Sequence, residues 1–280
     1  MFSLVSNDSC FLYRTDLTSR KADKLTARTE GCESDPSFSR DGKLIAYSVT
    51  NGNKEKSSIW IIHSDGTNDH RVMAATEDSS HPVFALDDKR LYFVRAGFFG
   101  HYSPIAREAK HDLDIFSVPI DGGEAAALTQ QHFYSLQSLS MSPDGKSLLV
   151  STTRYPIGPL LEEYVIDKPT GPHKVFQPHV PGEPSSGPSI GSAVYMPNGF
   201  YILFIAASNT HGGDYDYNVY RMSSVTGSEL QQLTLRTGMA NDVQAAPDGR
   251  SAIFTAGNEA YLVDLQTHAV KPLPMPVLTK

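Results

Sequence analysis

The chain has 280 residues, of which 40% are hydrophobic, 20% charged and 10% aromatic. This composition supplies enough apolar side chains for a sizeable core and excludes an intrinsically disordered chain. The formal net charge of −7 argues against a nucleic-acid-binding surface, which needs a basic patch facing the phosphates. No segment is long and apolar enough to span a membrane as a helix, so we expect a soluble globular protein.

One sequence phrase recurs along the chain: an alternating strand, an Asp-Gly-like turn and a second apolar strand. Its clearest copies are Asp35–Tyr47, His81–Phe93 and Ser138–Val150, and weaker copies surround Asn198 and Asp248. An Asx-Gly pair between alternating apolar runs is the strongest short-range signal for a β-hairpin. The turns follow one another at spacings of about 46 to 57 residues, which is typical of repeated β-structure.

A second phrase follows each copy and consists of an apolar strand, a polar turn and a short strand. Examples are Ile59–Ile62, Ile115–Val118 and Val219–Met222. The same phrase occurs at Phe11–Arg14, where no complete first phrase precedes it. No segment shows sustained helical periodicity, so the strands lack the crossover helices that a parallel sheet requires. Repeated four-stranded units of this length predict an all-β, six-bladed β-propeller of four-stranded antiparallel blades.

The repeats predict a single propeller domain over residues 1–280. Its first blade lacks the innermost strand, and we expect Val277–Thr279 to return to this blade, because propellers avoid open sheet edges by closing the ring. The predicted blades cover about 1–30, 31–76, 77–131, 132–178, 179–236 and 237–280.

These phrases resemble the TolB-type, WD40-like β-propeller repeats. The resemblance is carried best by Asp35–Tyr47, Ile115–Gly122, Leu128-Thr129 and Met141–Lys146, and it covers nearly the whole chain. It implies the propeller fold. It specifies no activity, because one fold hosts many functions and the motif residues are strand and turn residues.

One repeat position forms the first candidate site. The aligned repeats place a polar residue at the start of each inner strand, where these residues would form a ring at the mouth of the central channel. Such a ring can bind a small polar ligand or a cation, and lining a water-filled channel is the alternative. His81 is the member best suited to a metal ion or to acid–base chemistry. The ring consists of Asp35, His81, Ser138, Ser192 and Asp242.

The long connections between repeats form the second candidate site, because binding residues concentrate on loops held by a rigid scaffold. The longest excursion, Ala96–Asp112, is rich in aromatic residues. Exposed aromatics with an arginine are typical of interface hot spots, and a loop with buried Phe side chains is the alternative. The predicted partner-binding residues are Phe98, Phe99, His101, Tyr102, Arg154 and Tyr155.

The two cysteines, Cys10 and Cys32, are too few for a disulfide framework or a Cys-rich zinc site. Both fall near the first blade, where a disulfide is geometrically possible and two free thiols are the alternative. The N-terminus is too short and too uncharged for a signal peptide. We therefore expect a cytoplasmic protein, with the periplasm as the alternative if the N-terminus was trimmed.

The sequence contains a repeat scaffold without a convincing nucleophile, metal motif or phosphate loop. It therefore favours a non-enzymatic scaffold that binds a protein or peptide through the long-loop face and the channel mouth, as a monomer and without a cofactor. The alternative is a carbohydrate-active enzyme similar to oligogalacturonate lyases, with a metal ion or ligand at the channel mouth. In that alternative Arg154 would lie near a uronate carboxylate.

Overall fold

The computed structural model describes residues 2–6, 9–16, 22–28, 31–51, 56–73, 78–101, 108–154, 156–209, 214–235, 239–257 and 259–273. This part of the chain divides into two compact units, which we call unit 1 (residues 2–134) and unit 2 (residues 135–273). Its regular secondary structure consists of β-strands. Within the described ranges, no helix has the length and apolar character needed to cross a membrane. The single domain over 1–280 stays a prediction.

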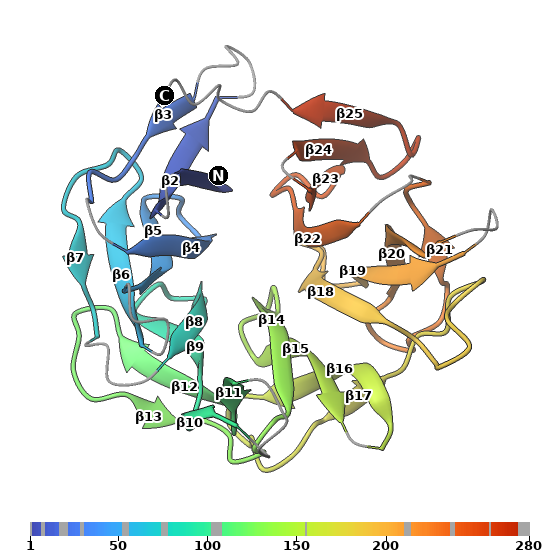
Figure 1. Ribbon diagram of the computed structural model, residues 1–280, viewed down its shortest axis with the longest axis horizontal. Helices are drawn as coiled ribbons and strands as arrows, with labels where there is room; N and C mark the ends of the chain where they lie inside the picture. Colours follow the sequence, from blue (N-terminus) through green and yellow to red (C-terminus); the bar gives the residue numbers. More distant parts are fainter. Residues whose placement is uncertain are drawn as a thin grey trace. The chain divides into compact units, whose positions relative to one another are not determined.

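Unit 1 contains one seven-stranded sheet, one four-stranded sheet and one two-stranded hairpin (Figure 1). The large sheet is formed by β1 (Phe2–Ser6), β2 (Ser9–Thr15), β3 (Ala22–Lys24), β4 (Cys32–Phe38), β5 (Leu44–Thr50), β6 (Ser57–His63) and β7 (His70–Arg71). The four-stranded sheet is formed by β8 (Ser79–Phe84), β9 (Arg90–Arg95), β12 (Asp114–Pro119) and β13 (Ala126–Ala127). The hairpin is formed by β10 (Phe98–Gly100) and β11 (Ala109–His111).

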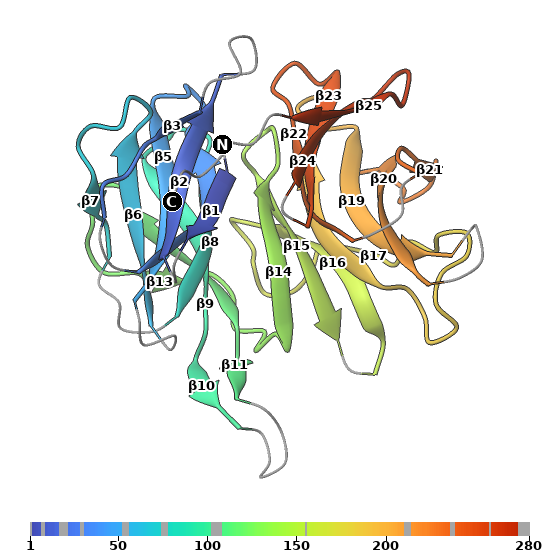
Figure 2. The same ribbon diagram turned by 45° about the horizontal axis from the view of Figure 1, so that its top comes forward.

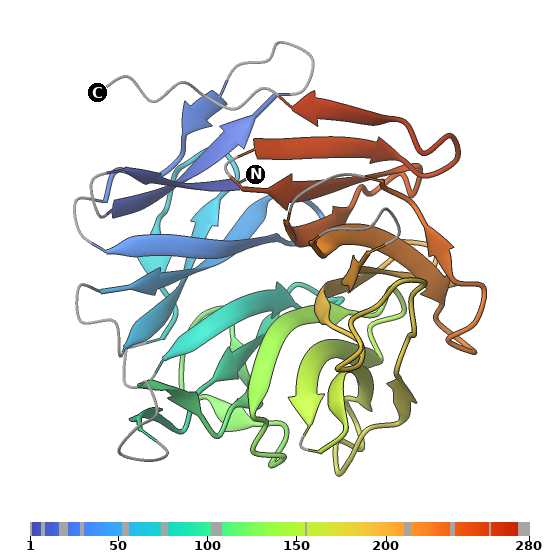
Figure 3. The same ribbon diagram turned by 45° about the vertical axis from the view of Figure 1, so that its right-hand side comes forward.

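Unit 2 contains three four-stranded antiparallel sheets, drawn from green through orange to red in Figure 3. The first is formed by β14 (Ser135–Met141), β15 (Ser147–Arg154), β16 (Gly158–Val165) and β17 (Lys174–Phe176). The second is formed by β18 (Ile190–Tyr195), β19 (Tyr201–Ser208), β20 (Asp216–Ser223) and β21 (Gln231–Gln232). The third is formed by β22 (Ala240–Ala245), β23 (Ser251–Ala256), β24 (Glu259–Asp264) and β25 (Val270–Leu273).

The predicted hairpin turns lie where the phrase placed them, between the first two strands of each complete repeat. Each turn needs one residue in the left-handed backbone region, which glycine adopts without a steric penalty. Asp88 occupies this region with a φ of 55° in the turn between β8 and β9, since Asp tolerates it better than most residues. The other four turns use Gly42, Gly145, Gly199 and Gly249, with φ between 65° and 74°.

The prediction of six four-stranded blades is wrong, because the described strands form five large sheets and one hairpin. The first repeat contributes only the three strands β1, β2 and β3, and β2 pairs in parallel with β4 at Cys10 and Cys32. The first two repeats therefore share one seven-stranded sheet. The predicted return of Val277–Thr279 lies outside the described residues.

Each unit has its own apolar core between neighbouring sheets. In unit 1, Ile59 and Ile61 of β6 pack against Leu91 and Phe93 of β9 in one cluster of buried residues. In unit 2, side chains from β18–β20 join two such clusters, one with β15–β17 and one with β22–β24. The central strands thus bury apolar residues on both faces, and burial at roughly 25 cal/mol per Å² stabilises the stacked sheets.

Candidate functional site

The five residues of the predicted ring lie at or next to β-bulges in the first strand of each complete repeat. The pairing register shifts by one residue in each of these strands. In unit 1 the shifts fall between Ser34 and Ser37 and between Ser80 and Val83. Bulges re-aim side chains out of the regular alternation of a strand, and all five residues at this repeat position are polar.

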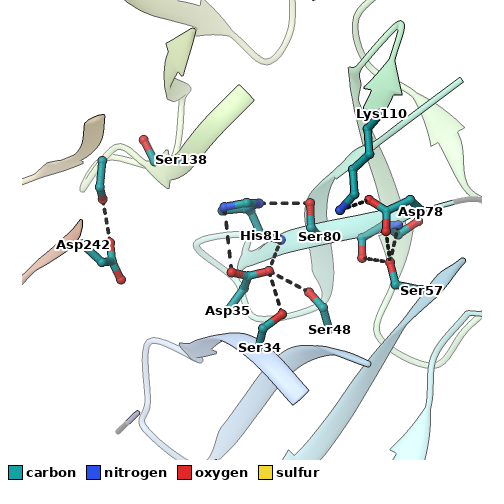
Figure 4. Close-up of polar contacts among 12 residues, drawn as sticks. Ser34, Asp35, Ser48, Ser57, Asp78, Ser80, His81, Lys110, Ser138 and Asp242 are labelled. Atoms are coloured by element: carbon teal, nitrogen blue, oxygen red, sulfur yellow. Dashed lines mark hydrogen bonds and ion pairs between the residues drawn. The ribbon is translucent and has the colours of Figure 1, made fainter. Parts of the chain in front are cut away.

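Asp35 and His81 come together in unit 1 (Figure 4). Both have a positive φ, 51° for Asp35 and 52° for His81. The Asp35 carboxylate accepts hydrogen bonds from the Ser48 hydroxyl at 3.1 Å and from the His81 amide at 3.4 Å, and its other oxygen lies 3.8 Å from His81 Nε2. His81 Nδ1 lies 3.0 Å from the Ser80 hydroxyl. The pair therefore joins the first strands of two neighbouring sheets, β4 and β8.

Ser138, Ser192 and Asp242 have the same linking role in unit 2. The Ser138 hydroxyl accepts a hydrogen bond from the Ala193 amide at 3.0 Å, and the Ser192 hydroxyl donates one to Asp242 at 2.6 Å. These bonds connect the first strands of successive sheets, β14 to β18 and β18 to β22. Ligand binding by a ring that combines all five residues stays a prediction.

The described ranges contain no group of three or more His, Cys, Asp or Glu side chains that could hold a metal ion. A metal ion at the channel mouth stays a prediction.

The predicted partner-binding residues lie in different places. Phe98, Phe99 and His101 belong to hairpin β10–β11 or follow its first strand. Arg154 ends β15 in unit 2, where it makes a bidentate contact with buried Glu162 at 2.6 and 2.8 Å. Tyr102 and Tyr155 lie outside the described residues. Arg154 is therefore engaged within its own sheet, while Phe98 is 41% exposed.

Hairpin β10–β11 projects from the sheet of β8, β9 and β12 (Figure 2). Its base is narrow, because the Gly97 amide donates to the carbonyls of His111 at 2.9 Å and Asp112 at 3.1 Å. A Cβ at residue 97 would lie 3.0 Å from the Asp112 Cβ, so glycine permits this close approach. The ammonium group of Lys110 pairs with the buried Asp78 carboxylate at 2.6 Å, which ties the hairpin to the sheet (Figure 4).

A cleft of about 370 Å³ lies at the base of this hairpin, entirely within unit 1. The Arg95 guanidinium packs over the Phe116 ring at 4.5 Å on one wall. Asp114 is fixed by the Thr129 hydroxyl at 2.7 Å and by the Gln131 amide at 2.6 Å. The side chain of His132 is 69% exposed. The cleft thus combines apolar, aromatic and charged groups, and its lining residues are Arg95, Ala96, Gly97, Phe98, Asp112, Asp114, Phe116 and His132.

Glu33, which is fully buried on β4, is a carboxylate that no sequence pattern singles out. It accepts hydrogen bonds from the Leu12 amide at 2.9 Å and from the Thr26 hydroxyl, and it pairs with Arg28 at 3.3 Å. The adjacent Cys10 and Cys32 form a disulfide, which decides between the two alternatives for the thiols. The one sequence signal for this link was the Cys10–Cys32 pair itself.

An aromatic and ionic cluster continues from Glu33 toward the outer strands of the same sheet. Arg28 donates to Asp69 at 2.6 Å and to the Tyr47 hydroxyl at 2.9 Å, and its guanidinium stacks on Trp60 at 3.6 Å. Burial raises the pKa of Tyr47, and its hydrogen bond to Asp69 adds to this shift. All these groups are satisfied within the cluster, so it stabilises the sheet rather than presenting a binding group.

Comparison with known proteins identifies the fold of the chain. No family model and no curated protein matches the chain. Among solved structures, a candidate TolB protein from Agrobacterium tumefaciens is similar at 16% identity with a TM-score of 0.68, over 92% of this chain and 86% of that one. The chain has a β-propeller fold. Its four-stranded antiparallel sheets are the blades of this fold.

Two further solved structures support the fold. TolB from Acinetobacter baumannii is similar at 15% identity with a TM-score of 0.66, over 95% of this chain, which spans only 60% of that protein. A chain in a nidogen/laminin complex is similar at 12% identity with a TM-score of 0.69, over 93% of this chain and 88% of that one. At these identities the similarity concerns the fold, because propellers host many unrelated functions.

Proposed function

We propose that this chain is a non-enzymatic β-propeller that binds a protein or peptide through the surface of unit 1 around hairpin β10–β11. The observation that carries the proposal is Phe98, a 41% exposed aromatic side chain beside the cleft of about 370 Å³. Aromatic anchors next to a pocket dominate the binding energy of many interfaces. A β-propeller scaffold with a TolB-type fold agrees with a binding role in general.

Contacts within unit 1 already hold the base of the hairpin in place before a partner binds, and this preorganisation favours binding. The Lys110–Asp78 ion pair and the two hydrogen bonds of the Gly97 amide fix its base. Within the hairpin, His111 Nε2 lies 2.9 Å from the Gly100 carbonyl and its ring lies 4.9 Å from that of Phe98. A preorganised surface loses less conformational entropy on association, so more of the contact energy becomes affinity.

The size of the cleft is sufficient for one side chain of a larger partner. Pockets for drug-sized ligands have volumes of about 300–1,000 Å³, and this cleft lies near the lower limit. The second hypothesis, a carbohydrate-active enzyme, is not favoured by the comparisons.

Site-specific photo-crosslinking tests the proposal. A photoreactive phenylalanine analogue is placed at Phe98 and, as a matched control, at Phe38, which is 46% exposed in the same unit. We expect a discrete crosslinked protein or peptide from position 98 and none from position 38. The partner is then purified, and Phe98→Ala should weaken its binding at least about tenfold, as for other aromatic anchors, while Phe38→Ala leaves it unchanged. Equal binding by wild type and Phe98→Ala would contradict the proposal.

We also propose that the protein works in an oxidising compartment, such as the periplasm, instead of the expected cytoplasm. The Cys10–Cys32 disulfide supports this location, because disulfides persist mainly outside reducing compartments. Labelling of free thiols in intact source cells, followed by fractionation, tests it. Complete labelling of both cysteines in a cytoplasmic fraction would refute this location.

A further inference from the structure

The carboxylates around the cleft differ in how they are satisfied. Asp78 is paired with Lys110, and Asp114 accepts hydrogen bonds from Thr129 and from backbone amides. Within the described ranges, the Asp112 carboxylate has no hydrogen bond or ion pair, although Asp112 lines the cleft. A carboxylate at a cleft without an internal partner is available to a cation that enters from solution.

The backbone brings this carboxylate next to an aromatic ring. Phe98 pairs with His111 across the hairpin, and Asp112 is the next residue along the chain. The hydrogen bond from the Gly97 amide to the Asp112 carbonyl holds the two ends of the hairpin together at this point. Phe98 and Asp112 therefore line the same cleft from the two sides of the hairpin base.

The one arginine of the lining faces its own sheet. The Arg95 guanidinium lies 4.5 Å from the Phe116 ring and 5.4 Å from the Phe93 ring, and its Nη2 lies 2.8 Å from the Met73 sulfur. The lining thus carries one fixed cation, Arg95, against the two carboxylates Asp112 and Asp114. The chain as a whole has a net charge of −7, which also favours a cationic occupant by charge complementarity.

We propose that the cleft binds an arginine side chain of the partner, with its guanidinium stacked on Phe98 and paired with Asp112. This inference rests on the proposed function and specifies the chemistry of the partner. Arginine fits better than lysine because its planar guanidinium stacks on aromatic rings and forms two parallel hydrogen bonds to one carboxylate. A flexible ammonium group lacks both of these contacts.

Titration with small probes tests this recognition in the 280-residue chain. N-acetyl-arginine methylamide is compared with its citrulline analogue, which has nearly the same shape but no charge, and binding is followed by the backbone NMR signals of unit 1. We expect saturable shifts at Gly97, Phe98 and Asp112 for the arginine probe and about tenfold weaker binding of the citrulline probe, since one charge-assisted contact contributes roughly that factor.

Two conservative variants locate the contacts. Asp112→Asn should weaken the arginine probe about tenfold without disturbing the fold, because Asn also tolerates the left-handed backbone that Asp112 adopts with a φ of 52°. Phe98→Leu removes the aromatic face and retains an apolar side chain, so it should also weaken binding. The control Asp87→Asn, in the turn between β8 and β9, should leave the affinity unchanged.

The outcomes separate this inference from the proposed function. Absence of saturable shifts, equal affinity for both probes, or an unchanged affinity in Asp112→Asn would overturn the arginine site. If a partner crosslinks at position 98 but Asp112→Asn binds it normally, the proposed function stands and the arginine site is wrong. If the arginine probe binds through Asp112 but no macromolecule crosslinks at position 98, the arginine site stands and the protein-binding function fails.

Discussion

The threonine at the end of a repeat is hydrogen-bonded in two different ways in this molecule. In two of the complete repeats, the threonine of the Leu-Thr ending bonds to a polar residue near the start of the third strand. Thr129 donates to Asp114 at 2.7 Å, and Thr234 donates to Asn218 at 2.9 Å. In the first repeat the equivalent hydroxyl, Thr26, donates to Glu33, which belongs to β4 of the next repeat.

The difference shows how an incomplete repeat is attached. In the first repeat the strand equivalent to β12 and β20 is β2, where the apolar Phe11 stands at the position of Asp114 and Asn218 and supplies no side-chain acceptor. Glu33 supplies the acceptor for both Thr26 and the Leu12 amide, while the backbone contributes only a single parallel bridge at Cys10 and Cys32. Side-chain bonds and a disulfide thus replace a continuous backbone ladder between β2 and β4.

Removal of the disulfide gives the largest expected effect. The Cys10–Cys32 bond closes a loop with a sequence separation of 22 residues, and a loop of this size stabilises a fold by about 3 kcal/mol. Cys10→Ser combined with Cys32→Ser should lower the free energy of unfolding of unit 1 by about that amount. Urea unfolding followed by the fluorescence of Trp60, which lies in unit 1 and is the single tryptophan of the chain, measures it.

The outcome decides whether the first repeat depends on side-chain links. Chemical reduction of the wild type should reproduce the effect of the double variant, and it should leave the double variant itself unchanged. An unfolding curve that is the same with and without the disulfide would show that the backbone bridge and Glu33 are sufficient.

A smaller loss of stability is expected when Thr26 or Thr234 loses its hydroxyl group. Thr26→Val removes a donor from a buried carboxylate and should cost about 2 kcal/mol, because hydrogen bonds to charged groups are worth more than neutral ones. Thr234→Val removes a donor from the neutral Asn218 amide and also the acceptor of the Val219 amide. It therefore loses two neutral hydrogen bonds of about 1 kcal/mol each and should also cost about 2 kcal/mol. Thermal unfolding of the two variants measures both costs, with Thr26→Ser and Thr234→Ser as controls that retain the hydroxyl. A cost of Thr26→Val only half that of Thr234→Val would show that the borrowed carboxylate is no stronger an acceptor than a neutral group.

The strands and turns of the complete repeats were predictable from local sequence. Each Asp-Gly pair places a residue with a left-handed backbone conformation in the turn between two strands. The alternation of apolar residues determines which side chains enter the core. The number of blades was predicted wrongly, because six copies of the second phrase do not show whether each copy has its own four strands.

The candidate site was predictable only in part. The aromatic excursion drew attention to Phe98, which the structure places beside a cleft, but the pairing of Arg154 with Glu162 depends on two strands that meet only in the folded sheet. Glu33 has no sequence signature, because its partners Leu12, Thr26 and Arg28 reach it only in the folded chain. Asp35-Pro36 and His81-Pro82 indicate the two bulges of unit 1 in the sequence, since a proline within a strand is typical of a bulge.

The smallest expected effect concerns the turns that the complete repeats share and the first repeat lacks. Hydrogen bonds from the Lys43 amide and side chain and from the Ser39 hydroxyl lower the pKa of Asp41 to about 2. A lowered pKa in the folded state means that this interaction stabilises the fold above the ordinary pKa of Asp, near 4, and is lost as the pH falls through about 2. The carboxyl is exposed, so solvent screening keeps its contribution to stability small. Carbon NMR of the Asp41 carboxyl should give a midpoint near pH 2, and Ser39→Ala should raise it. A midpoint in the ordinary range for Asp would show that this turn forms without the carboxylate cap.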